Sequence, residues 1–275
     1  MSREELIRSL FEKSSRGLEI GPSYNPIAAR RLGYQVDVLD HATADELRSK
    51  YKNEPNVDCD LIEDVDYVWS DRSLSETVGA VGIYDYILAS HVIEHTPDII
   101  GFLKECSLLL KPSGRLVLAV PDMRRCFDAF RPLTSLGGVL QAHTERRIRH
   151  SAATACDHVA YMAALDGRAG WGLGDEGDLR SAHSLEFAKF VYNRALTTTD
   201  YHDFHAWVFT PTSFRLLVSD LYAIGAIDLG EVSFQTTNAF EFITVLDTSK
   251  SVPRISRDIM LQQIRQELRE VPWKT

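Results

Sequence analysis

The stretch Gly17-Leu18-Glu19-Ile20-Gly21-Pro22-Ser23 decides the fold, because it combines a short apolar strand with a sharp turn. Gly21 can adopt backbone angles and close approaches that a Cβ atom would block. A helical segment is expected at 27–32, and a second strand follows at 35–39 and stops at Asp40. A carboxylate at such a strand end can accept hydrogen bonds from ribose hydroxyls. These features predict a nucleoside-binding site near the start of the chain.

The turn carries too few glycines for a dinucleotide. The dinucleotide fingerprint G-x-G-x-x-G uses three glycines to admit a pyrophosphate at a helix N-terminus. This turn offers Gly21 alone, and Pro22 follows it directly. A pyrophosphate is therefore disfavoured, and an adenosine ligand without phosphates is favoured. A catalytically silent or nicotinamide-binding α/β module stays open as an alternative, although the missing glycines argue against it.

Apolar strands alternate with helices through the first half of the chain. After the first two strands, further strands are expected at 57–61, 84–90 and 115–120. An amphipathic helix is predicted at 97–110, and the turn Lys-Pro-Ser-Gly at 111–114 ends it. Apolar strands of this length between helices are typical of a parallel sheet that is buried on both faces. The sequence therefore predicts an α/β fold.

The last part of the chain adds a helix, two strands and a terminal helix. Thr210 precedes Pro211 at the start of a helix, where the hydroxyl satisfies a free N–H group and the proline sits where none is needed. Two strands follow at 227–235 and 240–246. The final helix at 256–271 mixes apolar and charged residues, so we expect it outside the sheet or against a second subunit. A homodimer would form through this helix or through the cap of the insertion described next.

The segment 121–209, called the insertion below, is too long for an ordinary connection between a strand and its helix. We treat it as part of one domain that spans 1–275. Helices are expected in it at 136–148, 152–164 and 185–196, and together they would form a cap over the carboxyl ends of the strands. The loop 167–177 holds five glycines among charged residues, and it is either a solvated linker or a substrate lid.

The composition is that of an ordinary globular protein, with 275 residues of which 44% are hydrophobic and 25% charged. A net charge of -9 and an isoelectric point near 5.5 argue against nucleic acid as the partner, since its binding depends on clustered Lys and Arg. The chain shows neither a leader-like start nor an apolar run of membrane-spanning length, so we expect a cytoplasmic protein without membrane contact. Its four cysteines lack C-x-x-C spacing and are expected to be reduced core residues.

Glu19, Gly21 and Asp40 form an ordered series: an acidic residue, a glycine turn, and a second acidic residue at a strand end. This series resembles the first motif of class I S-adenosylmethionine-dependent methyltransferases, in the reduced form of small bacterial saccharide and polysaccharide methyltransferases. The 111–114 turn is similar to that family as well. The resemblance implies a Rossmann-like, seven-stranded, mostly parallel sheet with a C-terminal antiparallel hairpin and a helical cap insertion. It also implies S-adenosylmethionine as cofactor and a hydroxyl acceptor, with a saccharide as the best guess.

The resemblance also assigns residues to the parts of the cofactor. It implies Glu19, Gly21 and Ser23 around the methionine part, Asp40 at the ribose, Asp60 and Leu61 at the adenine, and Ser90 with His91 at the sulfonium. Pro22 and His41 complete the expected cofactor-binding set. Together these residues would line the carboxyl ends of the first four strands.

The sequence His91-Val-Ile-Glu94-His95 follows the fourth strand. On a helix, positions i, i+3 and i+4 share a face, so the three polar residues can converge. H-x-x-E-H is also the inverzincin signature of a zinc metallopeptidase, but here it sits at a strand end rather than inside a long helix. Some methyltransferases place Glu-x-x-Glu-His here to bind a divalent metal, which makes Glu94 and His95 candidate Mg²⁺ ligands. Alternatively, Ser90 and His91 line the cofactor cleft while Glu94 and His95 only hold the helix.

Methyl transfer to a sugar hydroxyl calls for a base or a metal, because the hydroxyl is too weak an acid to ionise unaided. Six of the nine histidines lie in the insertion. His143 is our first choice for the general base and His205 the second. Asp122 follows the fifth strand and should point into the cleft, where it can orient a hydroxyl, share a metal with Glu94 and His95, or merely cap the next segment. A non-methylating adenosine-binding module would need none of these.

Overall fold

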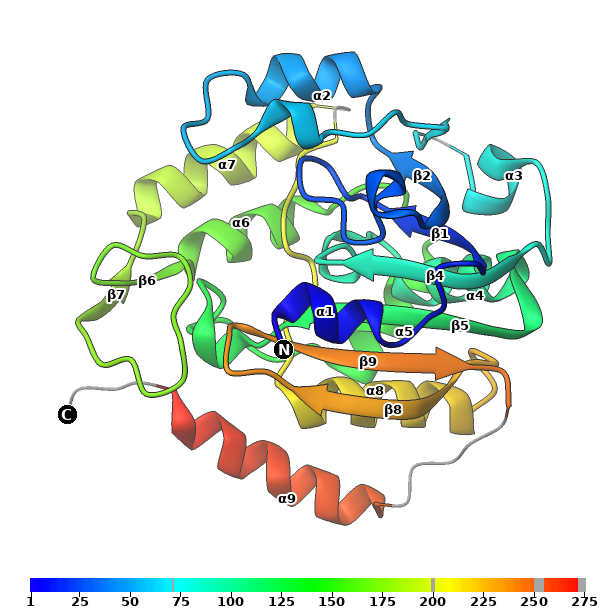
Figure 1. Ribbon diagram of the computed structural model, residues 1–275. Helices are drawn as coiled ribbons and strands as arrows, with labels where there is room; N and C mark the ends of the chain where they lie inside the picture. Colours follow the sequence, from blue (N-terminus) through cyan, green and yellow to red (C-terminus); the bar gives the residue numbers. More distant parts are fainter. Residues whose placement is uncertain (71, 199–200, 250–254, 272–275) are drawn as a thin grey trace.

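The computed structural model describes residues 1–70, 72–198, 201–249 and 255–271 (Figure 1). Seven strands of this part of the chain form one sheet in the order β3-β2-β1-β4-β5-β9-β8. Neighbours from β3 to β5 run parallel, whereas β9 is antiparallel to both β5 and β8. The strands are β1 (Arg16–Ile20), β2 (Gln35–Asp40), β3 (Tyr67–Val68), β4 (Tyr84–Ser90), β5 (Leu110–Pro121), β8 (Gly230–Thr236) and β9 (Glu241–Asp247). The expected Rossmann-like sheet with its C-terminal hairpin is confirmed.

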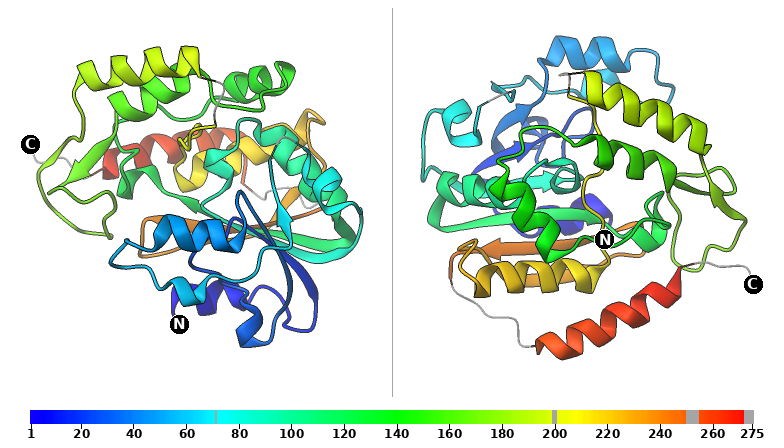
Figure 2. Two further views of the ribbon diagram at one scale, coloured as in Figure 1. Left: turned by 90° about the horizontal axis from the view of Figure 1, so that it is seen from above. Right: turned by 180° about the vertical axis from the view of Figure 1, so that it is seen from behind.

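Helices lie on both faces of this sheet and beside it (Figures 1 and 2). They are α1 (Arg3–Arg8), α2 (Ala44–Tyr51), α3 (Leu74–Val78), α4 (Ile99–Leu109), α5 (Leu136–Thr144), α6 (Ala152–Ala160), α7 (Leu185–Thr197), α8 (Pro211–Ala223) and α9 (Arg257–Glu267). Thr210 begins α8 with the predicted cap, since its side chain accepts a hydrogen bond from Ser213 N. None of the helices in the described ranges combines the length and the hydropathy that crossing a membrane requires.

Side chains of the central strands alternate between two apolar layers, as the period of a strand requires. On β5, Leu116 and Leu118 belong to the main core, which also contains buried residues of α4, α5 and α8. Val117 and Ala119 face the opposite layer, which Ile7 of α1 and the loop after β1 complete. The sheet is therefore buried on both faces, although the second face is covered by a loop and a short helix.

The helix expected at 27–32 is wrong. This segment runs as a loop up to the short 3-10 helix η1 (Arg30–Leu32), and Gly33 follows with a φ of 87°. The amides of Ile27 and Ala28 donate to the carboxylate of Glu19 at 2.7 and 3.0 Å. Glu19 thus holds this segment by its amides, and Ile27 and Ala28 pack in the second apolar layer of the sheet.

The strand expected at 57–61 is also wrong. This segment contains the 3-10 helix η2 (Cys59–Leu61), which begins where the Asp58 side chain accepts a hydrogen bond from Asp60 N. The strand that pairs with β2 is the two-residue β3 further along the chain. Aspartates favour such local side-chain to backbone bonds over a strand ladder, which explains the difference.

The insertion divides into two parts. Helix α5 packs against α4 and α8, with Val139 and Ala142 in the main core. Helices α6 and α7 pack against each other, beside a small hairpin of β6 (Ala163–Leu165) and β7 (Leu179–Ser181). The glycine-rich loop 167–177 connects these two strands. In Figure 1, α6, α7 and the hairpin stand on the side of the sheet where β1 and β4 end.

Candidate active site

The turn after β1 begins with a glycine in the left-handed region of backbone conformation. Gly21 has a φ of 65°, and its amide donates to the backbone of β2 at 2.7 Å. A Cβ atom there would lie only 3.0 Å from the Val92 side chain. After Pro22, Ser23 also has a positive φ of 52°, and its amide donates to Asp40 Oδ2 at 2.8 Å. The turn and the end of β2 therefore form one hydrogen-bonded unit.

Asp40 ties three segments together at this edge of the sheet. Besides the Ser23 amide, its carboxylate accepts the His41 amide at 2.7 Å, and His41 Nδ1 lies 2.6 Å from Oδ1. The Trp69 amide, just after β3, donates to the Asp40 carbonyl at 2.7 Å. Each carboxylate oxygen can accept a further hydrogen bond, so a ribose could still bind here. The role of Asp40 at the ribose stays a prediction.

Asp60 and Leu61, expected at the adenine, lie on η2 rather than on a strand end. The Asp60 side chain is exposed. The actual third strand is β3, and Trp69 follows it and packs against the main core. Sequence reasoning missed this strand because β3 is too short to be recognised from an apolar pattern.

The Glu19 side chain is buried and contacts backbone amides of the protein. Its side chain is 2% exposed, and both carboxylate oxygens accept the loop amides described above. Burial raises the pKa of Glu19 to about 7, against the lowering effect of those two amides. In this structure Glu19 holds the loop that covers the second face of the sheet.

A charged network surrounds the end of β4. Arg3 Nη2 donates to Ser90 Oγ at 2.6 Å and to Glu241 Oε2 at 2.9 Å. His91, with a φ of 55°, places Nε2 at 2.8 Å from the same Glu241 oxygen. Burial would lower the pKa of His91, but the hydrogen bond to Glu241 and the charge of the nearby Glu94 carboxylate raise it to about 9, so the imidazole is protonated at neutral pH.

Sequence reasoning missed Arg3 and Glu241. Glu241 is a charged residue at the start of an otherwise apolar strand, and that was its only signal. Because β9 is antiparallel to β5, its first residues lie at the edge where β5 ends.

Glu94 lies on the 3-10 helix η3 (Ile93–His95) and is fully buried. Neither carboxylate oxygen receives a hydrogen bond from any described residue. His91 Nδ1 at 3.4 Å and His95 Nε2 at 3.8 Å lie within ion-pair distance of Oε1. Burial would raise the pKa of Glu94, but the neighbouring histidines lower it. A buried anion without hydrogen bonds calls for a cation nearby.

His205 completes a cluster with Glu94 and His95, called the Glu94 cluster below. One ligand atom from each of the three lies within 4.8 Å of the others. His205 Nδ1 is 2.5 Å from Asp128 Oδ2, and both side chains are buried. Arg131 donates to the other Asp128 oxygen at 2.8 Å. Burial would raise the pKa of Asp128, but His205 and Arg131 lower it to about 2.

A second carboxylate contacts the other histidine of the cluster. His95 Nδ1 lies 2.7 Å from Asp203 Oδ1. The hydroxyl of Tyr201 donates to the His95 carbonyl at 3.3 Å. The His95 and His205 rings are perpendicular, with centroids 4.5 Å apart. In chemical terms the cluster can accept a proton at His205 Nε2 or hold a cation beside Glu94.

A family described as a methyltransferase domain matches residues 3–168, which is more than half of the chain. This chain belongs to that family.

Solved structures similar to this methyltransferase include the CcbJ methyltransferase from Streptomyces caelestis, with 15% identity, 89% of this chain and 88% of that chain covered, and a TM-score of 0.44. The PH0226 protein from Pyrococcus horikoshii OT3 has 15% identity, 89% and 87% coverage, and a TM-score of 0.43. The citrinin polyketide synthase CMeT domain has 12% identity and a TM-score of 0.39, and the match covers 87% of this chain and 47% of that one. No curated protein matches the chain.

Two residues expected at the centre of this methyltransferase lie apart from the Glu94 cluster. Asp122 is 3% exposed, and its carboxylate is paired with Arg124, with an Arg124 Nη2 to Oδ2 distance of 2.5 Å. It also caps the next turn by accepting the Arg124 amide at 3.1 Å. The cation-binding group found among the described residues contains His205 in the place expected for Asp122.

His143, our first choice for the base, lies on α5 against α4. Its Nδ1 is 2.8 Å from Asp98 Oδ2, and its Nε2 is 3.3 Å from Lys104 Nζ. Both partners belong to the start and middle of α4, so the structure does not bring His143 into the Glu94 cluster. His205, the second choice, is the histidine that joins it.

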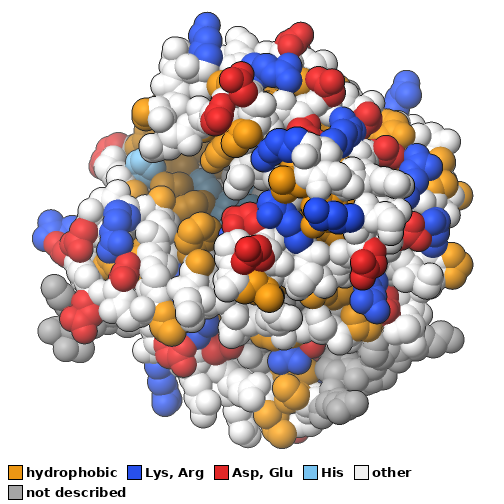
Figure 3. All heavy atoms as spheres, viewed as in Figure 1, with side chains coloured by type: hydrophobic (Ala, Val, Ile, Leu, Met, Phe, Trp, Pro, Cys, Tyr) orange, Lys and Arg blue, Asp and Glu red, His pale blue; other side chains and the backbone are white. Residues whose placement is uncertain are grey.

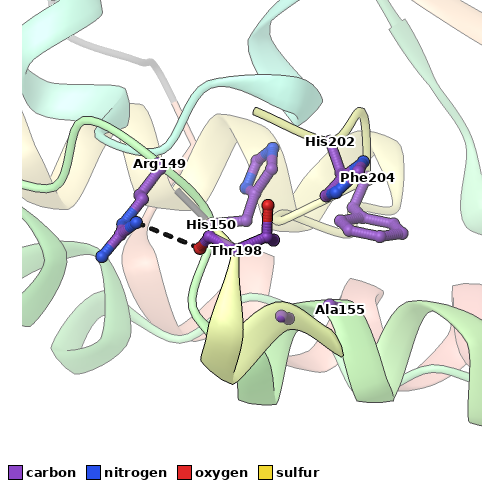
Figure 4. A pocket seen from close by; sticks show the side chains of 7 residues that line it. Arg149, His150, Ala155, Thr198, His202 and Phe204 are labelled. Carbon is purple, nitrogen blue, oxygen red and sulfur yellow. Dashed lines mark hydrogen bonds between the residues drawn. The ribbon is translucent and has the colours of Figure 1, made fainter. Parts of the chain in front are cut away.

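Histidine and hydrophobic side chains line a hollow on the face shown in Figure 3, over the space between α6 and the ends of β1 and β4. Within the insertion, a small cavity of about 20 Å³ is lined by His150, His202, Phe204, Arg149 and Thr198 (Figure 4). Arg149 donates to the Thr198 carbonyl at 3.3 Å. Burial lowers the pKa of His150 to about 4, so this imidazole is neutral. A cavity of this size holds one water molecule rather than a substrate.

Proposed function

We propose that this methyltransferase transfers a methyl group from S-adenosylmethionine to a hydroxyl of a small molecule, with a saccharide as acceptor. The observation that carries the proposal is the Glu94 cluster, because it offers a means of ionising a hydroxyl beside the end of β4. At the same edge, the glycine turn follows the neighbouring strand β1, and Asp40 ends β2, two strands away. A phosphate-free nucleoside fits a turn with one glycine better than a dinucleotide does.

The proposed reaction is an in-line displacement. The acceptor oxygen attacks the sulfonium methyl carbon, the carbon–sulfur bond breaks, and its electron pair stays on sulfur as S-adenosylhomocysteine. The hydroxyl proton must leave at or before this step. His205 Nε2 can take it, because Asp128 holds the other ring nitrogen as an orienting carboxylate does in a catalytic dyad. A divalent ion, for which Mg²⁺ is the sequence-based candidate, can acidify the hydroxyl instead.

A sugar-like acceptor is supported by an aromatic ring beside the cluster. Tyr201 is about half exposed, and its hydroxyl contacts the His95 carbonyl. An exposed ring can stack on the apolar face of a pyranose while the cluster contacts a hydroxyl. In keeping with the acidic charge, the acceptor is proposed to be a small molecule rather than a nucleic acid or membrane, and the enzyme is proposed to work in the cytoplasm.

The metallopeptidase alternative is not favoured. An inverzincin uses both histidines of H-x-x-E-H as zinc ligands and the glutamate as catalyst. In this chain Nε2 of His91 is bonded to Glu241, and the ligand group contains Glu94 itself. The family match likewise concerns methyl transfer.

The proposal is tested by titrating the protein with S-adenosylhomocysteine in a calorimeter, followed by an S-adenosylmethionine assay against a panel of saccharides. Asp40→Ala should weaken binding about 100-fold, because a carboxylate that accepts two ribose hydroxyls contributes roughly 3 kcal/mol. Asp45→Ala removes an exposed carboxylate of α2 and should leave binding unchanged. Absence of binding to the unmodified protein would overturn the proposed cofactor, and methylation of nitrogen or carbon alone would overturn the proposed acceptor.

A further inference from the structure

We propose that Glu94, His95 and His205 form a binding site for a divalent transition-metal ion of the zinc class, rather than for Mg²⁺. The inference rests on the proposed function in one respect: the acceptor hydroxyl is taken to be the ligand that completes the coordination. The binding site itself depends only on the geometry of the three side chains.

The first support is the unsatisfied charge of Glu94. Its side chain has no solvent exposure, and no described residue donates a hydrogen bond to either carboxylate oxygen. Burying a carboxylate in this way is unfavourable unless a cation or a donor approaches it. His91 and His95 stand at 3.4 and 3.8 Å from one oxygen, beyond hydrogen-bond length. A metal ion among the three ligands would contact this carboxylate directly.

The second support is the orientation of the two imidazoles. Histidines that bind metals usually hold their other ring nitrogen against a carboxylate or carbonyl, which fixes the tautomer and aims the lone pair. Here Asp128 holds His205 Nδ1 by a hydrogen bond of 2.5 Å, whereas His95 Nδ1 lies at ion-pair distance from Asp203, 2.7 Å, without the geometry of a hydrogen bond. Both Nε2 atoms are thus left for a ligand, and His95 Nε2 faces the Glu94 carboxylate.

The third support concerns the kind of metal. Two imidazole nitrogens and one carboxylate match zinc, cobalt, iron or manganese, whereas Mg²⁺ prefers oxygen ligands in an octahedron. Asp122, which would have added an oxygen ligand, is paired with Arg124 instead. Three protein ligands leave at least one position open, as in catalytic zinc sites.

The acceptor hydroxyl fits this open position. Its oxygen would coordinate the metal, and the proton would pass to water as the hydroxyl becomes more acidic. An acceptor oxygen ionised in this way would attack the sulfonium methyl carbon, and the carbon–sulfur bond would break with its electron pair left on sulfur. His205 acts in this scheme as a ligand, and its Nε2 lone pair is not available to a proton.

The competing arrangement is an ion network without metal, in which protonated His91 and His95 alone balance Glu94. The two arrangements are separated by stripping the protein with EDTA and titrating it with Co²⁺ while recording visible absorption, and with Zn²⁺ in a calorimeter. We expect one equivalent of Co²⁺ to bind and to produce d–d bands of low-coordinate cobalt. Mg²⁺ should not displace it.

Glu94→Gln and His205→Gln should each weaken Co²⁺ binding by at least about 100-fold, since each removes a direct ligand. Asp128→Asn should weaken it by about 10- to 100-fold through the orientation of His205. His183→Gln removes an exposed histidine of the insertion and should have no effect. S-Adenosylhomocysteine binding by each variant reports that the fold is intact.

Failure of Co²⁺ and Zn²⁺ to bind the unmodified protein would overturn the metal site. Equal binding by Glu94→Gln or His205→Gln would also overturn it, because the metal would then lie elsewhere. Methyl transfer that survives complete metal removal would leave the proposed function intact and return the base role to His205. Absence of S-adenosylhomocysteine binding to the unmodified protein would overturn the proposed cofactor but not the metal site.

Discussion

Glu19 belongs to the sequence motif, but in the structure its carboxylate stabilises a loop of the protein. Its carboxylate is buried, and it accepts two amides of the loop that covers one face of the sheet. Because a buried carboxyl favours its neutral form, the pKa of Glu19 rises to about 7. The residue therefore links the stability of this loop to pH.

Glu19 should contribute a downward slope to the unfolding free energy as the pH rises from about 4.5 to 7, because in this window the folded chain keeps a Glu19 proton that the unfolded chain has released. The loss is on the order of 3 kcal/mol when complete. Glu19→Gln should remove this slope, as measured by urea unfolding at several pH values across the window. Glu12→Gln, at an exposed carboxyl, should retain it. An unchanged slope in Glu19→Gln would show that Glu19 is ionised throughout.

Residues that follow one another along the chain were predictable from sequence, whereas residues that meet only in three dimensions were not. Gly21 and Asp40 end adjacent strands, so their neighbourhood followed from the strand pattern. The partners Asp128 and Glu241 come from distant segments, and nothing local marks them as neighbours of His205 and His91. Asp122 was expected to point into the cleft, but its carboxylate pairs with Arg124, two residues further along the chain.

At the level of elements, strands with a long apolar run were predicted with nearly correct ends. β2 and β4 span the expected residues. β5 begins earlier than expected, at Leu110, because Leu110 pairs with Tyr84 of β4 before the irregular segment 111–114. Elements whose amides are satisfied by side chains were missed. The loop at 27–32 and the 3-10 helix η2 both depend on a carboxylate that accepts backbone amides.

An acidic side chain of the terminal helix α9 contacts the N-terminus of α8. Glu267 accepts the Thr212 hydroxyl at 2.7 Å and the Thr212 amide at 3.2 Å, at the N-terminus of α8. Free amides and the helix dipole both favour an anion at this position.

Glu267→Ala should therefore lower the unfolding free energy by about 1 to 2 kcal/mol. Urea unfolding followed by circular dichroism measures the change. Gln266→Ala, at the exposed neighbouring position, should change it by less than about 0.5 kcal/mol. Equal effects of the two substitutions would mean that the Glu267 contact contributes nothing.

At the scale of the whole molecule, α7 leaves apolar side chains exposed. Leu185, Phe190 and Leu196 are each more than half exposed. Leu185 and Leu196 are about three turns apart and therefore share one face of α7. Exposed apolar residues on one face of a helix are typical of an interface. The homodimer expected from the sequence is therefore proposed to form through α7 of the insertion.

Light scattering should give twice the chain mass of 31.0 kDa. The double substitution Leu185→Glu and Leu196→Glu should give a monomer, because it places charges in the contact. Val81→Glu, which charges an exposed apolar residue outside α7, should leave the dimer intact. A monomer mass for the unmodified protein would refute the dimer, and a dimer in the double variant would place the contact elsewhere.

The antiparallel course of β9 has a consequence for biosynthesis. Glu241 is one of the last residues of the sheet to leave the ribosome, yet it contacts Arg3, one of the first. The residues that precede it contain the glycine turn, Asp40 and His91, but not the carboxylate to which the His91 ring is bonded. A nascent chain can thus build most of its sheet before the charged network at the end of β4 is complete.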